Sequence, residues 1–283
     1  MYNDSFGNSM KRGYFGLPIA IRTIITINVV MFLLQVFGLN SFFIQAMAFN
    51  PDLPTAVIQP WRLVTYMFLH AGGFHLLFNM LWLWWMGRSV EQHLGPRTFS
   101  VIYFGSGIGG ALLDIAFAQF VGINLVIGAS GAVFGIMVAF AMLFPRMPIM
   151  LFLLPPIEAR YVVAGLIALD LLFLGSSDNT ARIVHLGGAG IGYLLMRYHQ
   201  QGFDLSGLVR PLEQFWYNLK GTYQKKKSTR KSSNLRSVSD VEIVEEESEQ
   251  SELDKILEKI SRKGYDGLTK EEKQKLFELS KKN

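Results

Sequence analysis

Long apolar segments fill the first 200 of the 283 residues and leave few folds open to this chain. Ten of the 27 Lys and Arg residues precede residue 201, and only one of those ten, Lys11, is a lysine. A soluble domain cannot bury so much apolar surface, whereas a bilayer solvates it and requires helices that satisfy their own backbone hydrogen bonds. The pattern therefore predicts an all-α, polytopic membrane protein with a charged tail.

Six apolar segments are interpreted as membrane spans that form a helix bundle. We expect these spans at about residues 23–37, 74–86, 98–120, 130–144, 161–174 and 183–198. The cations gather before the first span and after the second, fourth and sixth spans, which by the positive-inside rule places both termini in the cytoplasm. The long connection between the first and second spans is apolar but broken by prolines, and it predicts a structured loop in the outer membrane interface.

Composition divides the chain into four parts. Residues 1–18 form a polar, cytoplasmic segment without the apolar core of a cleavable signal peptide, so the first span is expected to act as an uncleaved anchor. Residues 19–200 form the six-helix membrane domain. Residues 201–250 begin with a predicted interfacial helix and continue as a basic and then Ser- and Glu-rich disordered linker. Residues 251–283 carry helix-capping signals and predict a cytoplasmic helical hairpin that needs a partner for stability.

Several classes of function are excluded by what the composition lacks. The chain contains no Cys, which excludes disulfides, thiolate metal sites and a cysteine nucleophile. No metal-binding or nucleotide-binding motif is present, so we expect neither a metal nor a cofactor. The net charge of +5 follows from membrane topology and forms no stripe on a folded face, so membrane lipids rather than nucleic acid are the expected partners of the cations.

Two glycine-rich stretches place reactive side chains at the start of the fourth span and within the sixth. Ser130 follows Gly128-Ala129, and His185 is followed closely by Gly187-Gly188. A serine at the start of a helix is commonly an N-cap, and for an isolated Gly-x-Ser-Gly this structural role is the simpler interpretation. A histidine in a membrane-length apolar segment is costly, however, and indicates a functional site.

Both stretches continue as small-x-x-x-small patterns, which allow helix backbones to approach closely. The patterns are Gly131-x-x-x-Gly135 after the serine and Gly188-x-x-x-Gly192 after the histidine. Close approach would allow the His185 imidazole to take the proton of Ser130 and so activate the hydroxyl as a nucleophile. The alternative is that these glycines serve packing only, as they would in many transporters.

Together with three further motifs, these stretches resemble the rhomboid intramembrane serine proteases over about residues 21–198. The motifs, in order, are Trp61-Arg62, His70-x-x-x-x-His75-x-x-x-Asn79, Gly87-x-x-x-Glu91, Gly128-x-Ser130-Gly131 and His185-x-x-Gly188-x-x-x-Gly192. The resemblance implies transmembrane proteins as substrates and a catalytic dyad with Ser130 as nucleophile and His185 as general base. One departure is Val184, where the family often has alanine. No family resemblance extends beyond about Gly202.

The resemblance also implies an oxyanion site formed by His75, Asn79 and the backbone N–H of Ser130. A spacing of four residues places His75 and Asn79 on one face of the second span, and donors positioned in advance stabilise an oxyanion most where the dielectric is low. Hydrogen bonding between helices without chemistry is the alternative for Asn79. We expect His70 to be a loop histidine that faces water and leave it out of the catalytic set. The Trp61-Arg62 pair is expected at the lipid headgroups.

Two aspartates, Asp114 and Asp170, lie within predicted spans. A Ser–His–Asp triad would use one carboxylate to orient His185, but the family resemblance implies a dyad and the spacing singles out neither aspartate. We expect both to pair with polar groups between helices or near the ends of the spans. Glu91 and Arg88 are expected to form a structural turn at the cytoplasmic end of the second span.

Three functions are weighed against these observations. The first is an intramembrane serine endopeptidase of the cell (cytoplasmic) membrane that cuts membrane proteins near the outer boundary of a transmembrane segment. The second is a catalytically inactive relative that binds transmembrane helices, although such relatives lack the serine or the histidine. The third is a small-solute transporter, for which the chain shows no inverted repeat. The endopeptidase accounts for the most motifs, and the C-terminal hairpin would then recruit a cytoplasmic partner.

Overall fold

The computed structural model describes residues 13–150, 155–175, 179–211, 214, 269, 273 and 274. The chain divides into two compact units, Met1–Trp216 and Tyr217–Asn283. The predicted linker and nearly all of the predicted cytoplasmic hairpin lie outside the described residues, as do eight of the 18 residues of the predicted interfacial helix at 203–220. All helices and strands with assigned bounds belong to the first unit.

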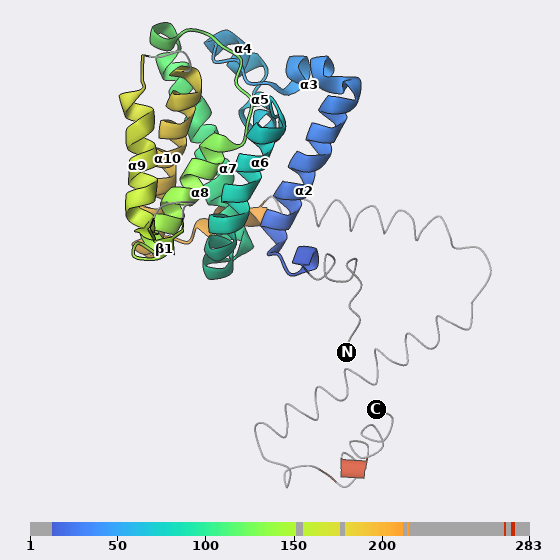
Figure 1. Ribbon diagram of the computed structural model, residues 1–283. Helices are drawn as coiled ribbons and strands as arrows, with labels where there is room; N and C mark the ends of the chain where they lie inside the picture. The colour runs from blue at the N-terminus through green and yellow to red at the C-terminus, as the bar shows by residue number, and fades with distance from the viewer. Residues whose placement is uncertain are drawn as a thin grey trace, which may run out of the picture. The chain divides into compact units, whose positions relative to one another are not determined.

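Helices build the described part of the first unit almost entirely (Figure 1). In chain order they are α2 (Ile19–Leu34), η1 (Gln35–Leu39), α3 (Asn40–Met47), α4 (Leu53–Ile58), α5 (Arg62–Thr65), η2 (Tyr66–Phe68), α6 (Gly73–Trp82), η3 (Leu83–Gly87), α7 (Arg88–Val121), α8 (Ser130–Leu143), α9 (Ala159–Leu172), α10 (Asn179–Gln200) and η4 (Leu205–Leu208). A short antiparallel hairpin between α8 and α9 pairs β1 (Pro148–Ile149) with β2 (Ile157–Glu158). The predicted helical character is confirmed, with this hairpin as the exception among the described residues.

Among the described residues, two helical stretches are long and apolar enough to cross a membrane, Ile19–Met47 and Gly73–Phe120. Helix α8 is apolar but shorter. Within the second stretch the helix breaks at Gly95, whose φ of +79° favours glycine and which precedes Pro96. This break separates the second predicted span from the third. The count of six spans and the cytoplasmic termini remain predictions.

The connection predicted between the first and second spans is structured, as expected. It consists of α3, α4, α5 and η2, and the three labelled helices gather at one end of the bundle (Figure 1). The indole N–H of Trp61 donates to the carbonyl of Ala46 at 3.0 Å, and the guanidinium of Arg62 donates to the carbonyls of Ala48, at 2.7 Å, and Gln45. The last carbonyls of a helix have no donor within it, so Trp61 and Arg62 cap the C-terminus of α3.

Glu91 holds the N-terminal end of α2. The residue is 3% exposed, and its two carboxylate oxygens accept hydrogen bonds from the backbone N–H groups of Ala20 and Ile21, each at 2.8 Å. These groups lie in the first turn of α2, where no acceptor exists within the helix and the helix dipole favours negative charge. Glu91 is therefore structural, as predicted, but it caps a distant helix rather than closing a local turn.

The helices α7, α8 and α10 pack against one another and form the core of the bundle. A Cβ atom added at Gly188 on α10 would overlap the carbonyl oxygen of Gly131 on α8, and one added at Gly192 would lie 2.5 Å from the Cα of Gly135. The two small-x-x-x-small patterns thus meet face to face. The predicted close approach of these two helices is confirmed.

The departure from the family pattern at Val184 is accommodated by glycines on the neighbouring helices. A Cβ atom added at Gly110 on α7 would lie 2.5 Å from the carbonyl oxygen of Val184. A Cβ atom added at Gly131 would lie 2.8 Å from Cγ1 of Val184. Because neither glycine has a side chain, the valine fits between α7 and α8 without separating them.

Gly188→Ala is expected to destabilise the membrane domain, and Gly190→Ala on the same helix is the matched control. Alanine at position 188 must push α8 and α10 apart, because the backbone of Gly131 cannot move aside as a side chain can. Nothing lies within 4 Å of the Cβ position of Gly190, so the control gains helix propensity of about 1 kcal/mol without a clash.

Thermal unfolding in detergent should therefore give a lower Tm for Gly188→Ala than for the wild type. The control should show an unchanged or higher Tm. Equal Tm values for the two variants would contradict the backbone contact between α8 and α10.

Candidate active site

Backbone hydrogen bonds anchor the segment before α8 at two points, and these set the position of Ser130. Phe49 and Val126 exchange two backbone hydrogen bonds of 3.0 and 2.8 Å, and the N–H of Gly128 donates to a carbonyl of η2 at 3.0 Å. Gly128 has a φ of +128°, which favours glycine, and a Cβ atom there would lie 2.7 Å from Cε1 of His75. A side chain at position 128 would therefore be strained by the backbone conformation and would also clash with the imidazole of His75.

Ser130 and His185 lie within hydrogen-bond distance of each other. Oγ of Ser130 is 2.7 Å from Nε2 of His185. Ser130 is the first residue of α8, as predicted, but no side-chain capping bond occurs at this helix start, so the N-cap interpretation does not account for the serine. Both residues are partly buried, so the hydroxyl and the imidazole meet in a sheltered but accessible place.

A cleft of about 670 Å³ opens beside this pair. Ser130, His185 and His75 line it, together with Asn124 from the segment before α8 and Thr180 near the start of α10. Nδ2 of Asn124 donates to Oγ1 of Thr180 at 3.3 Å, which links two walls of the cleft. The cleft thus brings together three of the four predicted site residues.

His75 and Asn79 lie on α6, one turn apart. The backbone N–H of Ala71 donates to Nδ1 of His75 at 3.4 Å, which assigns the ring proton to Nε2 and makes that nitrogen a donor. Asn79 is 6% exposed, does not occur among the described residues that line the cleft, and donates through Nδ2 to the carbonyl of His75 at 2.8 Å. One predicted side-chain donor therefore lines the cleft, and the other lies one helical turn away.

His70 does not face water, and the expectation that it does is wrong. The residue is 2% exposed, its ring meets that of His75 at an angle of 64° with centroids 5.1 Å apart, and neither ring nitrogen has a hydrogen-bond partner among the described residues. Burial, with a smaller effect of His75, lowers the pKa of His70 to about 3, so this ring is neutral at physiological pH. His70 packs against His75 and does not line the described cleft.

Phe134 contacts His185 although none of the motifs includes it. The phenyl ring stacks on the imidazole with centroids 4.5 Å apart and 10° between the planes. Phe134 follows Ser130 by four residues and so lies on the same face of α8, one turn later. That spacing is the sequence signal that could have identified it, and the stack restricts the tilt of the imidazole.

The two aspartates differ in their surroundings. Oδ2 of Asp170 on α9 lies 3.0 Å from Nδ1 of His185. Asp114 on α7 is fully buried, and neither of its carboxylate oxygens has a hydrogen-bond partner in the part of the chain that the structure describes. The expectation that both aspartates pair with polar groups therefore holds for Asp170 and is wrong for Asp114. Only the folded structure distinguishes the two.

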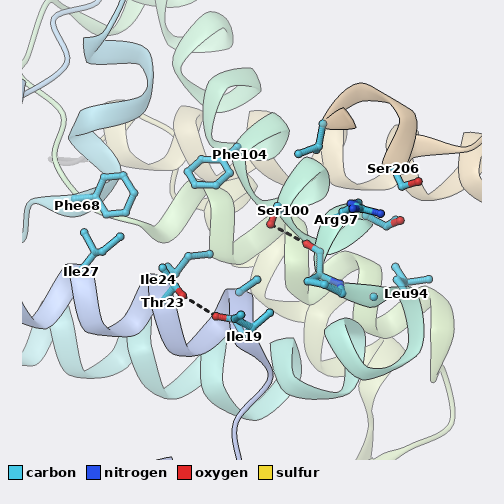
Figure 2. A pocket seen from close by; sticks show the side chains of 15 residues that line it. Ile19, Thr23, Ile24, Ile27, Phe68, Leu94, Arg97, Ser100, Phe104 and Ser206 are labelled. Atoms are coloured by element: carbon cyan, nitrogen blue, oxygen red, sulfur yellow. Dashed lines mark hydrogen bonds between the residues drawn. The ribbon is translucent and has the colours of Figure 1, made fainter. Parts of the chain in front are cut away.

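A second cavity, of about 600 Å³, lies between α2, the start of the third predicted span and η4 (Figure 2). Phe68 and Phe104 contribute aromatic rings to its wall. The hydroxyls of Thr23 and Ser100 are donated to carbonyls of their own helices, each at 2.8 Å, and so are not available to a ligand as donors. None of the predicted site residues lines this cavity, so the cleft beside Ser130 is the candidate active site.

Comparison with known families agrees with the motifs. The rhomboid domain model matches residues 58–201, about half of the chain, and this range includes every predicted site residue. A second model, a family of unknown function (DUF6576), matches residues 243–282, where the motifs indicated no family. This second match covers most of the predicted C-terminal hairpin and does not overlap the rhomboid match in sequence.

Curated relatives carry the same family name. RHOMBOID-like protein 1 of Arabidopsis thaliana is 37% identical over 137 residues, which is 48% of this chain and 34% of that protein. Rhomboid protein 1, mitochondrial, of Saccharomyces cerevisiae is 37% identical over 135 residues, or 45% of this chain and 38% of that protein. Rhomboid protease GluP of Bacillus subtilis is 32% identical over 177 residues, or 61% of this chain and 33% of that protein.

The matched region thus spans about a third of the length of each of these relatives. The family model, in contrast, matches about half of this chain and encloses both Ser130 and His185. On this match, the protein belongs to the rhomboid family.

Proposed function

We propose that this protein is an intramembrane serine endopeptidase that cleaves transmembrane segments of membrane proteins. The observation that carries the proposal is the 2.7 Å distance between Oγ of Ser130 and Nε2 of His185, on two packed helices of a rhomboid-family chain. A serine hydroxyl needs a base at this distance to become a nucleophile. One relative, Rhomboid protease GluP, is itself named as a protease.

In the proposed reaction, Nε2 of His185 takes the proton of Ser130 while Oγ attacks the scissile carbonyl carbon. The imidazolium then returns this proton to the leaving amine, which departs and leaves an acyl-enzyme. A water molecule repeats the two steps, which frees Ser130 and the new carboxyl terminus of the substrate. For this cycle Nε2 must begin unprotonated, so the proton of the neutral ring must lie on Nδ1.

Three donors are proposed for the oxyanion. The backbone N–H of Ser130 lies in the first turn of α8, where N–H groups have no acceptor within the helix. His75 lines the cleft as a donor through Nε2, and the amide of Asn79 has a second N–H besides the one bound to the His75 carbonyl. Donors that are already in place stabilise the developing charge without reorganisation, which matters most in a site of low dielectric.

The surroundings of the site support transmembrane segments as substrates. The helices around Ser130 are apolar, and the cleft lies at the start of α8 and α10, which are the outer ends under the predicted topology. A peptide bond inside an intact helix is shielded, so the substrate must unwind near the cut. We therefore assign cleavage to the outer boundary of a substrate's transmembrane segment, in the cell membrane, by a protease with cytoplasmic termini.

A catalytically inactive rhomboid-like protein that binds transmembrane helices is the alternative. Such a protein needs a surface for the substrate helix but no activated nucleophile. The contact between Ser130 and His185, and the cleft that opens beside it, favour the protease because both serve bond cleavage rather than helix binding.

Ser130→Ala and His185→Ala are each expected to abolish cleavage of a transmembrane substrate in liposomes, with Tm close to that of the wild type. The two side chains act as one unit, so the double variant should be no less active than either single variant. Labelling of the wild type by a fluorophosphonate gives an independent readout of Ser130. Near-normal cleavage by either single variant would exclude the dyad.

Asn79→Ala is expected to reduce kcat with little change in KM, by up to the roughly hundred- to thousand-fold that the loss of one oxyanion donor costs. Steady-state kinetics on one purified substrate would measure both constants. A loss confined to KM would instead assign Asn79 to binding or to structure, for which its bond to the His75 carbonyl is already suited.

The C-terminal hairpin is proposed to recruit a cytoplasmic partner or the cytoplasmic tail of a substrate. A separate family model matches residues 243–282, and the linker before it is too polar to bury a core. The predicted topology assigns the hairpin to the cytoplasm and Ser130 to the outer end of its span, across about 30 Å of hydrocarbon. Direct participation of the hairpin in the chemistry is therefore not expected.

A chain that ends at Gln224 should accordingly insert, fold and cleave a model substrate at close to the full-length rate. The measurement compares the truncated and full-length proteins on one purified substrate in liposomes, with Tm as the check on folding. A truncated protein that folds normally but loses most of its activity would contradict the recruiting role and indicate coupling across the membrane.

A further inference from the structure

His185 is held by three side chains, of which Ser130 accounts for one ring nitrogen. The other nitrogen, Nδ1, lies 3.0 Å from Oδ2 of Asp170, and Phe134 stacks on the face of the ring. The side chains of His185 and Asp170 are only 19% and 17% exposed, so this contact is largely sheltered. Asp170, His185 and Ser130 thus form a continuous line of hydrogen bonds across α9, α10 and α8.

We propose that Asp170 is a positioning residue that completes a Ser130–His185–Asp170 triad in this protein. This arrangement goes beyond the two-residue dyad that the family resemblance implies. The inference rests on the proposed function, because it assigns Asp170 a part in the same reaction. Asp170 acts on that reaction only through His185.

The first effect of Asp170 is to select the reactive tautomer of His185. A carboxylate only accepts hydrogen bonds, so the ring nitrogen beside it carries the proton. Nδ1–H then donates to Oδ2 of Asp170, and Nε2 keeps the lone pair that accepts the proton of Ser130. During attack the serine proton moves to Nε2 while the Nδ1 proton stays on the ring, so the carboxylate remains ionised throughout.

The second effect of Asp170 is to offset charge. His185 becomes a cation when it accepts the serine proton, and an unpaired cation among apolar helices is costly. The carboxylate 3.0 Å away compensates this charge, and the attraction is stronger than in water because the surrounding dielectric is low. Phe134 presents only a ring face to the imidazole, so it cannot replace the hydrogen bond to Nδ1.

The hairpin of α9 and α10 explains why Asp170 and His185 meet. Asp170 lies two residues before the end of α9, and His185 lies six residues, about 9 Å, after the start of α10. Oδ1 of Asn179 accepts the N–H of Gly175 at 2.7 Å and ties the two ends of the turn together. The contact between Asp170 and His185 therefore lies near the ends of two consecutive helices that this bond keeps close together.

The test compares Asp170→Asn and Asp170→Glu with the wild type and with Leu169→Ala, a half-exposed neighbour on α9 that serves as the control. For each protein, four quantities are measured: kcat and KM on one purified transmembrane substrate in liposomes, the rate of fluorophosphonate labelling of Ser130, and Tm. The amide of Asp170→Asn is isosteric with the carboxylate but can present an N–H to Nδ1, which favours the unreactive tautomer.

We expect Asp170→Asn to lower kcat and the labelling rate by at least about ten-fold, with KM and Tm near the wild-type values. Asp170→Glu restores a carboxylate and should retain more activity than the asparagine variant. Leu169→Ala should behave as the wild type, since its side chain is half exposed and, being apolar, gives His185 no hydrogen bond.

Wild-type kcat and labelling in Asp170→Asn would overturn the proposal. The proposal would also be overturned if the asparagine and glutamate variants lost activity only in proportion to the folded protein that they lose. A wild-type protein that neither cleaves substrate nor reacts with fluorophosphonate would instead overturn the proposed function, and the positioning role with it. Labelling that falls from aspartate to glutamate to asparagine at constant Tm supports Asp170 as the third member of the triad.

Discussion

The backbone contact between α8 and α10 is the interaction on which the candidate active site depends. The axes of helices with ordinary side chains between them lie about 8–10 Å apart. Here the backbones of α8 and α10 touch, and Oγ of Ser130 lies 2.7 Å from Nε2 of His185. Gly131 and Gly188 face each other without Cβ atoms, one residue after Ser130 and three residues after His185. In a bilayer no hydrophobic force drives helices together, so van der Waals contact of this kind carries their association.

Polar contacts between distant parts of the chain stabilise the helix ends around that core. Glu91 caps the start of α2, Arg62 caps the end of α3, and Gln35 exchanges hydrogen bonds of 3.1 and 3.3 Å with the backbone of His70. Helix ends expose backbone groups that lipid cannot satisfy. These contacts therefore allow an apolar domain to contain short helices and irregular segments. Gln35 in particular holds the loop before α6, and this loop carries Ala71, which lines the cleft.

The two sides of the cleft are built by different means. On one side, side-chain contacts from α8 and α9 hold His185 in the orientation that its proposed role as general base requires. On the other side, His75 packs between the buried His70 and the bare backbone of Gly128. Its distance from Ser130 is thus set by the loops before α6 and α8, which are joined through η2. A small shift in either loop would change the distance between His75 and Ser130, on which the proposed oxyanion site depends.

Order and spacing along the chain by themselves determined the helical class, the family, the serine at a helix start and the facing glycine patterns. Each of these depends on residues close in sequence or on the fixed period of a helix. Only the tertiary structure decided that Asp170 rather than Asp114 meets His185, and that His70 is buried. The physical reason is that lipid-facing and core-facing positions are equally apolar in a membrane domain, so hydropathy does not reveal how a helix is rotated or which helices are neighbours. Thus α8 is buried on most sides and α9 is widely exposed, although both are apolar throughout most of their length.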